Sequence, residues 1–444
     1  MCPGVGQGRD RNGPRTRTRV ETEACPSTRT RIETDECPGV GQGRGRNSPG
    51  TRTRVETEAC PGTRARVKID VCSGVRTMVE IEVCPGARRR VKTKVCQGGP
   101  KRYEGQMALR WGIITAGKIS HDFVNAFNSY PDKGDQVIAA VAARSATKAS
   151  EFAKLHNIPK VFESYHAMVV TNEIDIVYIG ALNPDHYGLA KMCLENGKHV
   201  LCEKPLCLNY KQTESIIRLA KKTNLFLMEA VWSRFSPIYL ALEKEINSGK
   251  LGDVHYVEVN FGSPISAVQR VCMKDLGGSA VLDIGIYTLQ FAQFIFKEEP
   301  TKVTAIGELN EDGVDLVDTV VLDYAGGKKA VLNINSKVRL INNATVYGNK
   351  GRATIEDPFH FPTSMIHADG STEKIPLHTS PIPYNFENSA GLVFQALEVA
   401  RCIKQGLKAS PRMPHKESLT LAKLEDEIRR QVGVKFDVDS EEYP

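Results

Sequence analysis

Apolar runs separated by helical stretches dominate the chain from residue 108 to about residue 228. Five runs have the pattern of strands: 108–115 (ALRWGIIT), 136–142 (QVIAAVA), 175–180 (DIVYIG), 198–202 (KHVLC) and 225–228. Helical stretches follow the first run to about residue 128 and then cover 147–156, 184–196 and 209–223. Short apolar runs bounded by turn signals are typical of buried parallel strands. Their alternation with helices predicts an α/β fold with a parallel, doubly wound sheet.

The first 106 residues follow a different pattern, a repeat of about a dozen residues. Their seven cysteines are spaced by 23, 12, 23, 12, 12 and 12 residues, and each unit combines Cys-Pro-Gly with an Arg/Thr run. Large apolar residues are too few to offset the entropy of ordering such a segment. We therefore expect 1–106 to be a disordered, low-complexity extension. The amino-acid composition changes at Met107, as it would at an internal start codon. We therefore expect the extension to be absent from the working protein.

Two alternatives for the repeat stay open. A disulfide or metal array would need closely paired cysteines such as Cys-x2-Cys, which the repeat lacks, and we expect no metal site. A basic arm for nucleic acid would use the arginines, but acidic residues are interleaved with them and Tyr103 is the one aromatic residue in the segment.

The charge of the chain divides at the same place. Residues 1–106 hold 22 Lys+Arg against 12 Asp+Glu, whereas residues 107–444 hold 37 against 40, so the repeat carries all of the +7 excess. A protein built to hold nucleic acid would need its basic patch on the folded part, so we expect no nucleic-acid partner.

Membrane and secretory signals are weak in this sequence. We find no run of about 18 apolar residues and no apolar leader, so we expect neither a membrane span nor secretion. The five cysteines of 107–444 are scattered and odd in number. They have the pattern of reduced thiols, and we expect a cytoplasmic protein.

The turn after the first strand has the pattern of a degraded phosphate-binding loop. The usual G-x-G-x-x-G becomes Thr115-x-Gly117-x-x-Ser120, which keeps only the middle glycine. That glycine admits a pyrophosphate, and the backbone N–H groups of a helix N-terminus favour an anion. A plain strand-to-helix turn is the alternative.

The end of the second strand indicates which nucleotide is bound. NAD sites place an acid there for the ribose 2′-OH, and NADP sites place an arginine. This chain has Arg144 followed by Ser145 and no acid, which favours NADP. An ordinary solvated arginine is the alternative.

Two further motifs carry groups suited to proton transfer. Lys204 comes just after the strand 198–202, where open α/β sheets bind ligands. Asp283 and Tyr287 are four residues apart on an apolar helix over about 277–296, so they share a face. A buried Asp283 needs a partner, for which Lys204 is a candidate. An ammonium near Tyr287 would favour its phenolate and bring its pKa toward the range of a general base. The alternative is that Asp283 only caps the helix and Tyr287 only packs in the core.

These motifs together resemble the glucose–fructose oxidoreductase/inositol dehydrogenase family over essentially all of 107–444. The resemblance rests on the order of WGIITAGKIS, NPDHYGLA, VLCEKPL, LMEAVWSRFSP, GGSAVLDIGIYTLQF and YGNKGRATIEDP. It implies a Rossmann domain over 107–230 and a C-terminal α+β domain over 231–444 with a large, open, mostly antiparallel sheet. Strands are expected at 254–261, 303–307, 317–324, 329–336 and 344–347. It also implies a homodimer joined through that sheet.

The resemblance assigns roles to particular residues. It implies that Lys204 and Tyr287 form an acid/base pair that Asp283 orients. Trp232 and Phe261 would form apolar walls for the substrate, with ordinary core aromatics as the alternative. The residues implied to line the cofactor are Thr115, Gly117, Lys118, Ile119, Arg144, Tyr178, Asn183, His186, Glu203 and Lys204.

The resemblance implies an NADP-dependent dehydrogenase that oxidises a small-molecule cyclic vicinal diol or sugar hydroxyl. A trans-dihydrodiol would become a catechol, and D-xylose a xylonolactone. A non-catalytic NADP-binding regulator on the same fold is the alternative, although a sensor need not keep an acid/base set. A protein that binds nucleic acid through the repeat is the third possibility.

Overall fold

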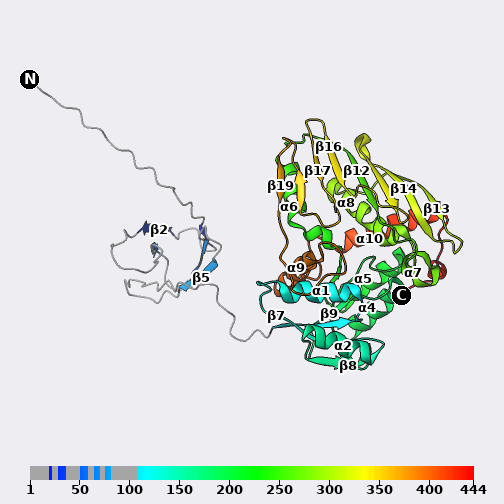
Figure 1. The fold of residues 1–444 in the computed structure, drawn as a ribbon. Helices are drawn as coiled ribbons and strands as arrows, with labels where there is room; N and C mark the ends of the chain where they lie inside the picture. Colours follow the sequence, from blue (N-terminus) through cyan, green and yellow to red (C-terminus); the bar gives the residue numbers. More distant parts are fainter. Residues whose placement is uncertain (1–19, 23–28, 37–50, 59–64, 71–75, 82–107) are drawn as a thin grey trace, which may run out of the picture. The chain divides into compact units, whose positions relative to one another are not determined.

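The computed structural model describes residues 108–444 and five short segments of the first 107 residues (Figure 1). The five segments are the strands β1 (Val20–Thr22), β2 (Arg29–Glu36), β3 (Thr51–Glu58), β4 (Ala65–Asp70) and β5 (Arg76–Ile81). Strands β2 and β3 form one antiparallel pair, and β1, β4 and β5 form a second small sheet. These five segments are extended and paired, which suits their alternating Thr, Val and Ile residues, and the disorder that we expect over 1–106 stays a prediction. The rest of the repeat lies outside the described residues, and its absence from the working protein stays a prediction.

The chain divides into two units, 1–104 and 105–444, and the second holds a six-stranded parallel sheet. Its strands are β6 (Leu109–Ile114), β7 (Gln136–Ala142), β8 (Lys160–Phe162), β9 (Ile176–Ile179), β10 (His199–Cys202) and β11 (Leu227–Glu229). They lie in the order β11-β10-β9-β6-β7-β8, all parallel. This is the doubly wound order of Rossmann sheets, with its topological switch point between β6 and β9. The predicted sheet is confirmed, with the short β8 as an addition.

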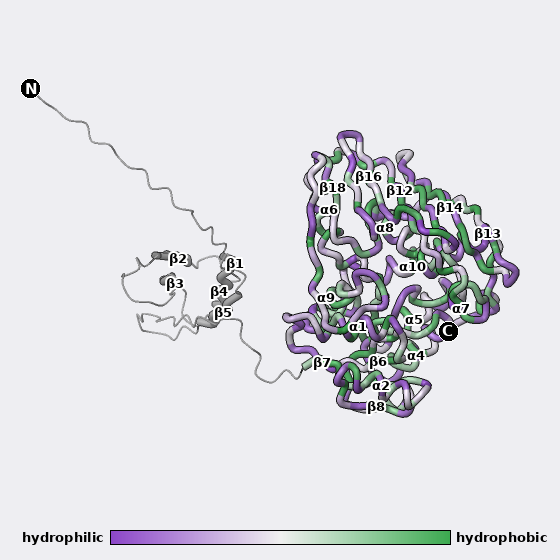
Figure 2. The backbone as a smooth tube through the Cα atoms, in the orientation of Figure 1, coloured by the Kyte–Doolittle hydropathy of each residue, from purple (hydrophilic) through white to green (hydrophobic). Residues whose placement is uncertain are grey.

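Helices connect these strands and cover the sheet. They are α1 (Lys118–Ser129), α2 (Ala146–His156), α3 (Tyr165–Val169), α4 (His186–Glu195) and α5 (Tyr210–Lys222). Three of them begin at a residue whose side chain accepts a backbone N–H three residues on: Ser145 for α2, Ser164 for α3 and Asn209 for α5. The apolar segments of Figure 2 gather where helices meet the sheet, and Trp111 and Ile113 of β6 are fully buried there.

A second, eight-stranded sheet follows along the chain. Its strands are β12 (Val254–Gly262), β13 (Lys302–Leu309), β14 (Asp315–Asp323), β15 (Lys329–Asn335), β16 (Ala344–Gly348), β17 (Arg352–Ile355), β18 (Ser364–Ile366) and β19 (Thr372–Lys374). The order is β13-β14-β15-β12-β16-β17-β18-β19, antiparallel except for the parallel pair β12 and β15. The predicted mostly antiparallel sheet is confirmed, and β17 to β19 extend it.

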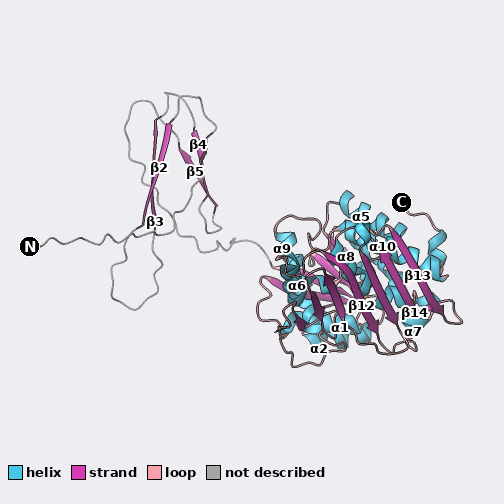
Figure 3. Cartoon of the chain, turned by 90° about the horizontal axis from the view of Figure 1, so that it is seen from above, coloured by secondary structure: helices cyan, strands magenta, loops and turns pink. Residues whose placement is uncertain are grey.

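One face of this sheet packs on helices and the other is open. Helices α6 (Pro237–Asn247), α8 (Ile286–Phe296) and α10 (His415–Val432) pack against it (Figures 1 and 3). Along β14, buried Asp318, Val320 and Leu322 alternate with half-exposed residues such as Thr319. Such alternation is typical of an antiparallel sheet that has one solvated face.

Within the described residues, one stretch, Lys274–Phe296, is by length and composition alone long and apolar enough to cross a membrane, although the sequence pattern predicts no span. It is a core element, because 83% of its most apolar window is buried inside the protein. The single helix predicted over about 277–296 is also divided, into the π-helical turn η4 (Val281–Gly285) and α8, and the 3₁₀ turn η3 (Lys274–Leu276) precedes it. Asp283 lies in the π turn, a feature often found at functional sites.

The five cysteines of the second unit are free thiols, and four of them are buried. Burial raises the pKa of the Cys193 thiol to about 12. Buried thiols of this kind are structural rather than reactive.

Candidate functional site

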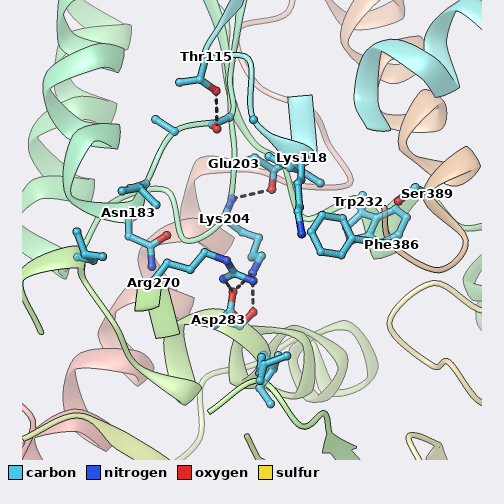
Figure 4. Close-up of a pocket in the computed structure, with 18 of the residues that line it drawn as sticks. Thr115, Lys118, Asn183, Glu203, Lys204, Trp232, Arg270, Asp283, Phe386 and Ser389 are labelled. Carbon is cyan, nitrogen blue, oxygen red and sulfur yellow. Dashed lines mark hydrogen bonds and ion pairs between the residues drawn. The ribbon is translucent and has the colours of Figure 1, made fainter. Parts of the chain in front are cut away.

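A cavity of about 650 Å³ lies at the carboxyl ends of the parallel strands and extends toward the second sheet. Its wall draws on the β6–α1 turn, the ends of β7, β9 and β10, and loops as distant in sequence as Ser389 (Figure 4). It therefore includes the switch point between β6 and β9, where open α/β sheets bind ligands.

The β6–α1 turn uses unusual residues in place of two glycines. Thr115 has φ 80°, in the left-handed region that favours glycine. Its hydroxyl donates a 2.7 Å hydrogen bond to the Gly180 carbonyl and lies 3.1 Å from the Ser120 hydroxyl. A Cβ at Gly180 would lie 2.4 Å from that Ser120 oxygen, so a glycine in β9's loop makes room for the serine. The turn is thus held by side chains that a glycine-rich loop lacks.

The same turn leaves room for an anion. A Cβ built on Gly117 would meet nothing closer than 3.9 Å, and no side chain caps the first N–H groups of α1. Uncapped N–H groups at a helix start are available to a phosphate. Lys118 and Ile119 also line the cavity, as predicted.

At the end of β7, the cavity wall is basic. Arg144 is exposed and lines the cavity together with Ser145 and Lys148. The Ser145 hydroxyl already accepts the Lys148 backbone N–H at 3.3 Å, so it acts as the cap of α2. Our sequence reasoning missed Lys148, although its position four residues after Arg144 places both on one side of the helix start.

Lys204 and Asp283 meet at the other end of the cavity, as predicted. Lys204 Nζ donates to the Asp283 backbone oxygen at 2.5 Å and to its Oδ1 at 3.2 Å. Arg270, from the short helix α7 (Gln269–Cys272), donates to the same Oδ1 at 2.6 Å (Figure 4). Although burial opposes it, the two cations hold the pKa of Asp283 below its usual value. Asp283 in turn overcomes the effect of burial and raises the pKa of Lys204. Lys204 and Asp283 are therefore both charged at neutral pH.

Tyr287 lies beside this ion cluster. The Lys204 Nζ is 5.1 Å from the centroid of its ring, and Trp232 Nε1 donates a 2.9 Å hydrogen bond to its hydroxyl oxygen. Our expectation that Lys204 would lower the pKa of Tyr287 is wrong as a net effect, because burial raises that pKa by more than the Lys204 charge lowers it. Tyr287 is therefore a neutral phenol at neutral pH.

Two predicted cofactor residues lie behind the wall and do not line the cavity. Tyr178 is fully buried, stacks on Phe123 at 3.9 Å and donates a 2.7 Å hydrogen bond to Glu203. His186 is 1% exposed, with Nδ1 2.8 Å from the Pro205 carbonyl oxygen and Nε2 3.2 Å from that of Ala181. The sequence placed both near the strand ends, but their side chains turn inward, where they support the residues that do line the cavity.

Glu203 and Asn183 line the cavity as predicted. Burial raises the pKa of Glu203 to about 7, although Tyr178 and Lys204 oppose this. The Asn183 side-chain amide donates a 3.2 Å hydrogen bond to the Gly277 carbonyl. Asn183 thereby connects the loop after β9 to the segment that leads to Asp283.

Aromatic side chains form the wall around Tyr287. Trp232 stacks on Phe361 with centroids 4.5 Å apart, and Phe261 stacks on His360 at 4.9 Å. Both Trp232 and Phe261 line the cavity, so the structure places them at the surface that we predicted for substrate.

The far part of the chain supplies residues that the sequence reasoning missed. They are Ser263, Ile265, Arg270, Arg339, Asn342, Pro358, His360, Phe386, Glu387 and Ser389. Only the aromatic-flanked run 357–362 (DPFHFP) could have drawn attention to any of them.

A strap over 378–389 brings three of these residues to the cavity. The fully buried Asp122 of α1 accepts the backbone N–H of Asn385 and that of Phe386, each at 2.9 Å. Asn125 of the same helix donates to the Ile382 carbonyl at 2.9 Å. The helix whose start faces the cavity therefore also anchors the strap, and the strap contributes Phe386, Glu387 and Ser389 to the cavity wall.

Comparison with known proteins covers nearly all of the second unit. The profile of the oxidoreductase family with an NAD-binding Rossmann fold (GFO/IDH/MocA) matches residues 109–231, and that of the GFO/IDH/MocA C-terminal domain matches residues 239–354. The trans-1,2-dihydrobenzene-1,2-diol dehydrogenase of Xenopus laevis is 42% identical over 331 residues, which are 74% of this chain and 100% of that protein. The human protein of the same name is 38% identical over 334 residues, which are 75% of this chain and 99% of its own.

Solved structures share the fold at lower identity. A 3-ketoreductase from Actinomadura kijaniata, in complex with NADP and TDP-benzene, is 23% identical with a TM-score of 0.63 over 73% of this chain and 98% of its own. An oxidoreductase from Agrobacterium radiobacter, in complex with NAD+, L-tartaric acid and magnesium, is 17% identical with a TM-score of 0.63 over 73% of this chain and 96% of its own. Similar folds thus hold either nucleotide.

Proposed function

Since this chain belongs to the GFO/IDH/MocA family of oxidoreductases, we propose that it oxidises a hydroxyl of a cyclic vicinal diol or an aldose with NADP as hydride acceptor. Loss of a hydride and a proton would convert a trans-1,2-dihydrobenzene-1,2-diol into a ketone, and this ketone would tautomerise to catechol. D-xylose would become xylonolactone. The observation that carries the proposal is the meeting of Lys204, Asp283 and Tyr287 at one end of a cavity whose other end is the β6–α1 turn.

The residues of that turn fit a dinucleotide. Gly117 leaves open space, and the uncapped start of α1 offers N–H groups to a pyrophosphate. Arg144 and Lys148 would hold a ribose 2′-phosphate, and no acid stands between β7 and α2 to repel it. These features support NADP over NAD. Bound NADP supplies the nicotinamide carbon that accepts the hydride.

The chain's own groups then handle the proton. Asp283, which Arg270 also binds, holds the Lys204 ammonium in one place, where its charge stabilises negative charge that develops on a substrate oxygen. Tyr287 receives the hydroxyl proton when it is a phenolate, a form favoured by Lys204 and by the Trp232 hydrogen bond. In the reverse direction, the neutral phenol gives a proton to a carbonyl.

The apolar wall favours a ring as substrate. Trp232 is 5% and Phe261 is 6% exposed, and both border the cavity next to Tyr287. Their faces exclude water and suit the flat face of a cyclic diol or a sugar ring.

NADPH formation by the full-length chain tests the proposal. We expect turnover of trans-1,2-dihydrobenzene-1,2-diol and of D-xylose, and a loss of at least about 10²-fold in kcat in Lys204→Met and in Tyr287→Phe. Lys423→Met and Tyr210→Phe, at positions away from the cavity, serve as matched controls. No turnover of any diol or aldose would overturn the proposal, and an unchanged rate in Tyr287→Phe would overturn the role of Tyr287.

We also propose that the open face of the eight-stranded sheet pairs with a second copy of the chain. Half-exposed Thr319, Asn333 and Thr354 lie on this face, and Ile306 of the edge strand β13 is 70% exposed. Light scattering should give twice the chain mass of 48.9 kDa, and a monomer mass would contradict the pairing. The free thiols support a reducing compartment, and we propose the cytosol, which cell fractionation tests.

A further inference from the structure

Among the described residues that line the cavity, His360 and Ser389 have a buried polar atom without a hydrogen-bond partner, and His360 lies next to Tyr287. His360 is in the loop between β17 and β18, between Phe359 and Phe361, both of which are fully buried. Phe361 stacks on Trp232, and Phe359 packs edge-on against Phe261 at 5.4 Å. These two anchors hold the His360 backbone in place, and the imidazole between them borders the cavity.

The imidazole lies among the groups that we assign to substrate binding. Its ring is parallel to that of Phe261, with 11° between the planes, and its centroid is 5.4 Å from the Tyr287 ring. It is 5.9 Å from the Trp232 ring. A substrate ring that reaches the Tyr287 hydroxyl therefore also meets His360.

The Nδ1 atom of His360 is buried and has no hydrogen-bond partner. Burial, helped by the charges of Lys204 and Arg339, lowers the pKa of His360 to about 3, so the ring is neutral. A neutral imidazole has one N–H donor and one acceptor nitrogen. A buried polar atom without a partner is costly, so a ligand that reaches the imidazole and supplies a partner is favoured.

The neighbouring groups are already engaged. Tyr287 accepts from Trp232, and Asp283 accepts from Lys204 and Arg270. These groups surround the hydroxyl that is oxidised, but none of them is left for a second oxygen on the adjacent ring carbon.

We propose that His360 binds the second hydroxyl of a vicinal diol, the one adjacent to the hydroxyl that Tyr287 deprotonates. The inference rests on the proposed function and extends it, because His360 then selects vicinal diols over monoalcohols. The imidazole forms one hydrogen bond to the neighbouring oxygen, while Phe261 beneath it supports the ring.

A matched pair of ligands tests this proposal on the full-length chain: trans-cyclohexane-1,2-diol and cyclohexanol, which differ by one hydroxyl. Binding is followed by quenching of Trp232 fluorescence, with and without NADPH, so that no turnover is required. We expect His360→Phe to weaken diol binding about tenfold and to leave cyclohexanol unchanged. His360→Gln, which keeps a donor and an acceptor, should retain most of the diol affinity.

Controls separate this role from packing and from the proposed function. NADPH affinity should be equal in wild type and both His360 variants, and the exposed His166→Phe should behave as wild type. Equal weakening of both ligands, no weakening, or a wild type that binds both ligands equally would overturn the proposal. If wild type forms no NADPH from any diol or aldose but diol binding still depends on His360, the proposed function fails and the assignment of His360 stands.

Discussion

Lys204 Nζ donates two hydrogen bonds to Asp283, one to the backbone oxygen at 2.5 Å and one to Oδ1 at 3.2 Å. The two residues are 79 positions apart in the sequence. Lys204 follows strand β10 of the first sheet, and Asp283 lies in the π turn η4, just before α8. Both side chains are nearly buried, with 13% and 11% exposed. The ion pair therefore joins the nucleotide-binding half to the helix that carries Tyr287.

Asp283→Asn should reduce both activity and stability. The amide removes the charge that balances Lys204 and Arg270, and leaves the nearly buried Lys204 ammonium next to a second cation without a counterion. We expect kcat/KM to fall about 10²-fold and the free energy of unfolding to fall by about 3 kcal/mol. Steady-state kinetics and urea denaturation measure these two effects. An active, equally stable Asp283→Asn would contradict the role of the pair.

The direction of the reaction should depend on pH through Tyr287. Its raised pKa leaves little phenolate at neutral pH, so kcat/KM for oxidation should rise about tenfold per pH unit up to that pKa. Reduction of the ketone needs the phenol and should stay level over neutral pH and fall only in strong alkali. Initial rates in both directions across pH test this, and a pH-independent oxidation rate would contradict it.

Glu229→Gln should stabilise the protein at alkaline pH. Burial raises the pKa of Glu229 to about 7 from 4.5, so the folded state binds more protons than the unfolded state between these values. Ionisation of Glu229 therefore destabilises the fold progressively as pH rises from 4.5 to about 7, and the loss is constant above that pH. We expect a gain of about 2–3 kcal/mol at pH 8 and little change near pH 4, measured by urea denaturation at each pH. The glutamine keeps the acceptor for the Leu206 N–H. Equal effects at both pH values would contradict the assignment.

Asp122→Ala should release the strap over 378–389. The change leaves the N–H groups of Asn385 and Phe386 without their acceptor, which costs about 2 kcal/mol. We expect faster proteolysis within the strap and a severalfold higher KM, since Phe386 borders the cavity. The exposed Asp132→Ala is the matched control. Unchanged proteolysis and KM would show that other contacts hold the strap.

Arg144→Ala should change the choice of nucleotide. The loss of a charge-assisted contact to a 2′-phosphate should weaken NADP binding about 10- to 100-fold and NAD binding little. Arg430→Ala, on the exposed side of α10, controls for the loss of one positive charge. Fluorescence titration with both nucleotides measures the ratio, and equal losses would remove the argument for NADP.

The sequence alone predicted five of the six strands of the first sheet, the turn after its first strand and the position of Lys204. These features depend on local periodicity and on covalent adjacency, since a residue that follows a buried parallel strand must lie at the sheet's ligand-binding edge. The four-residue spacing of Asp283 and Tyr287 was equally local, even though the turn proved to be π-helical.

Only the tertiary structure decided what surrounds those residues. Arg270 reaches the cavity from the short helix α7 and His360 from a loop, and the paths of both segments depend on distant contacts. Tyr178 and His186 turn inward because their partners lie behind the wall. The pKa of Tyr287 went against the expectation from sequence because desolvation, which no spacing reveals, outweighed the charge of Lys204. Neighbours along the chain are set by covalent bonds, whereas burial and long-range contacts exist only once the chain has packed.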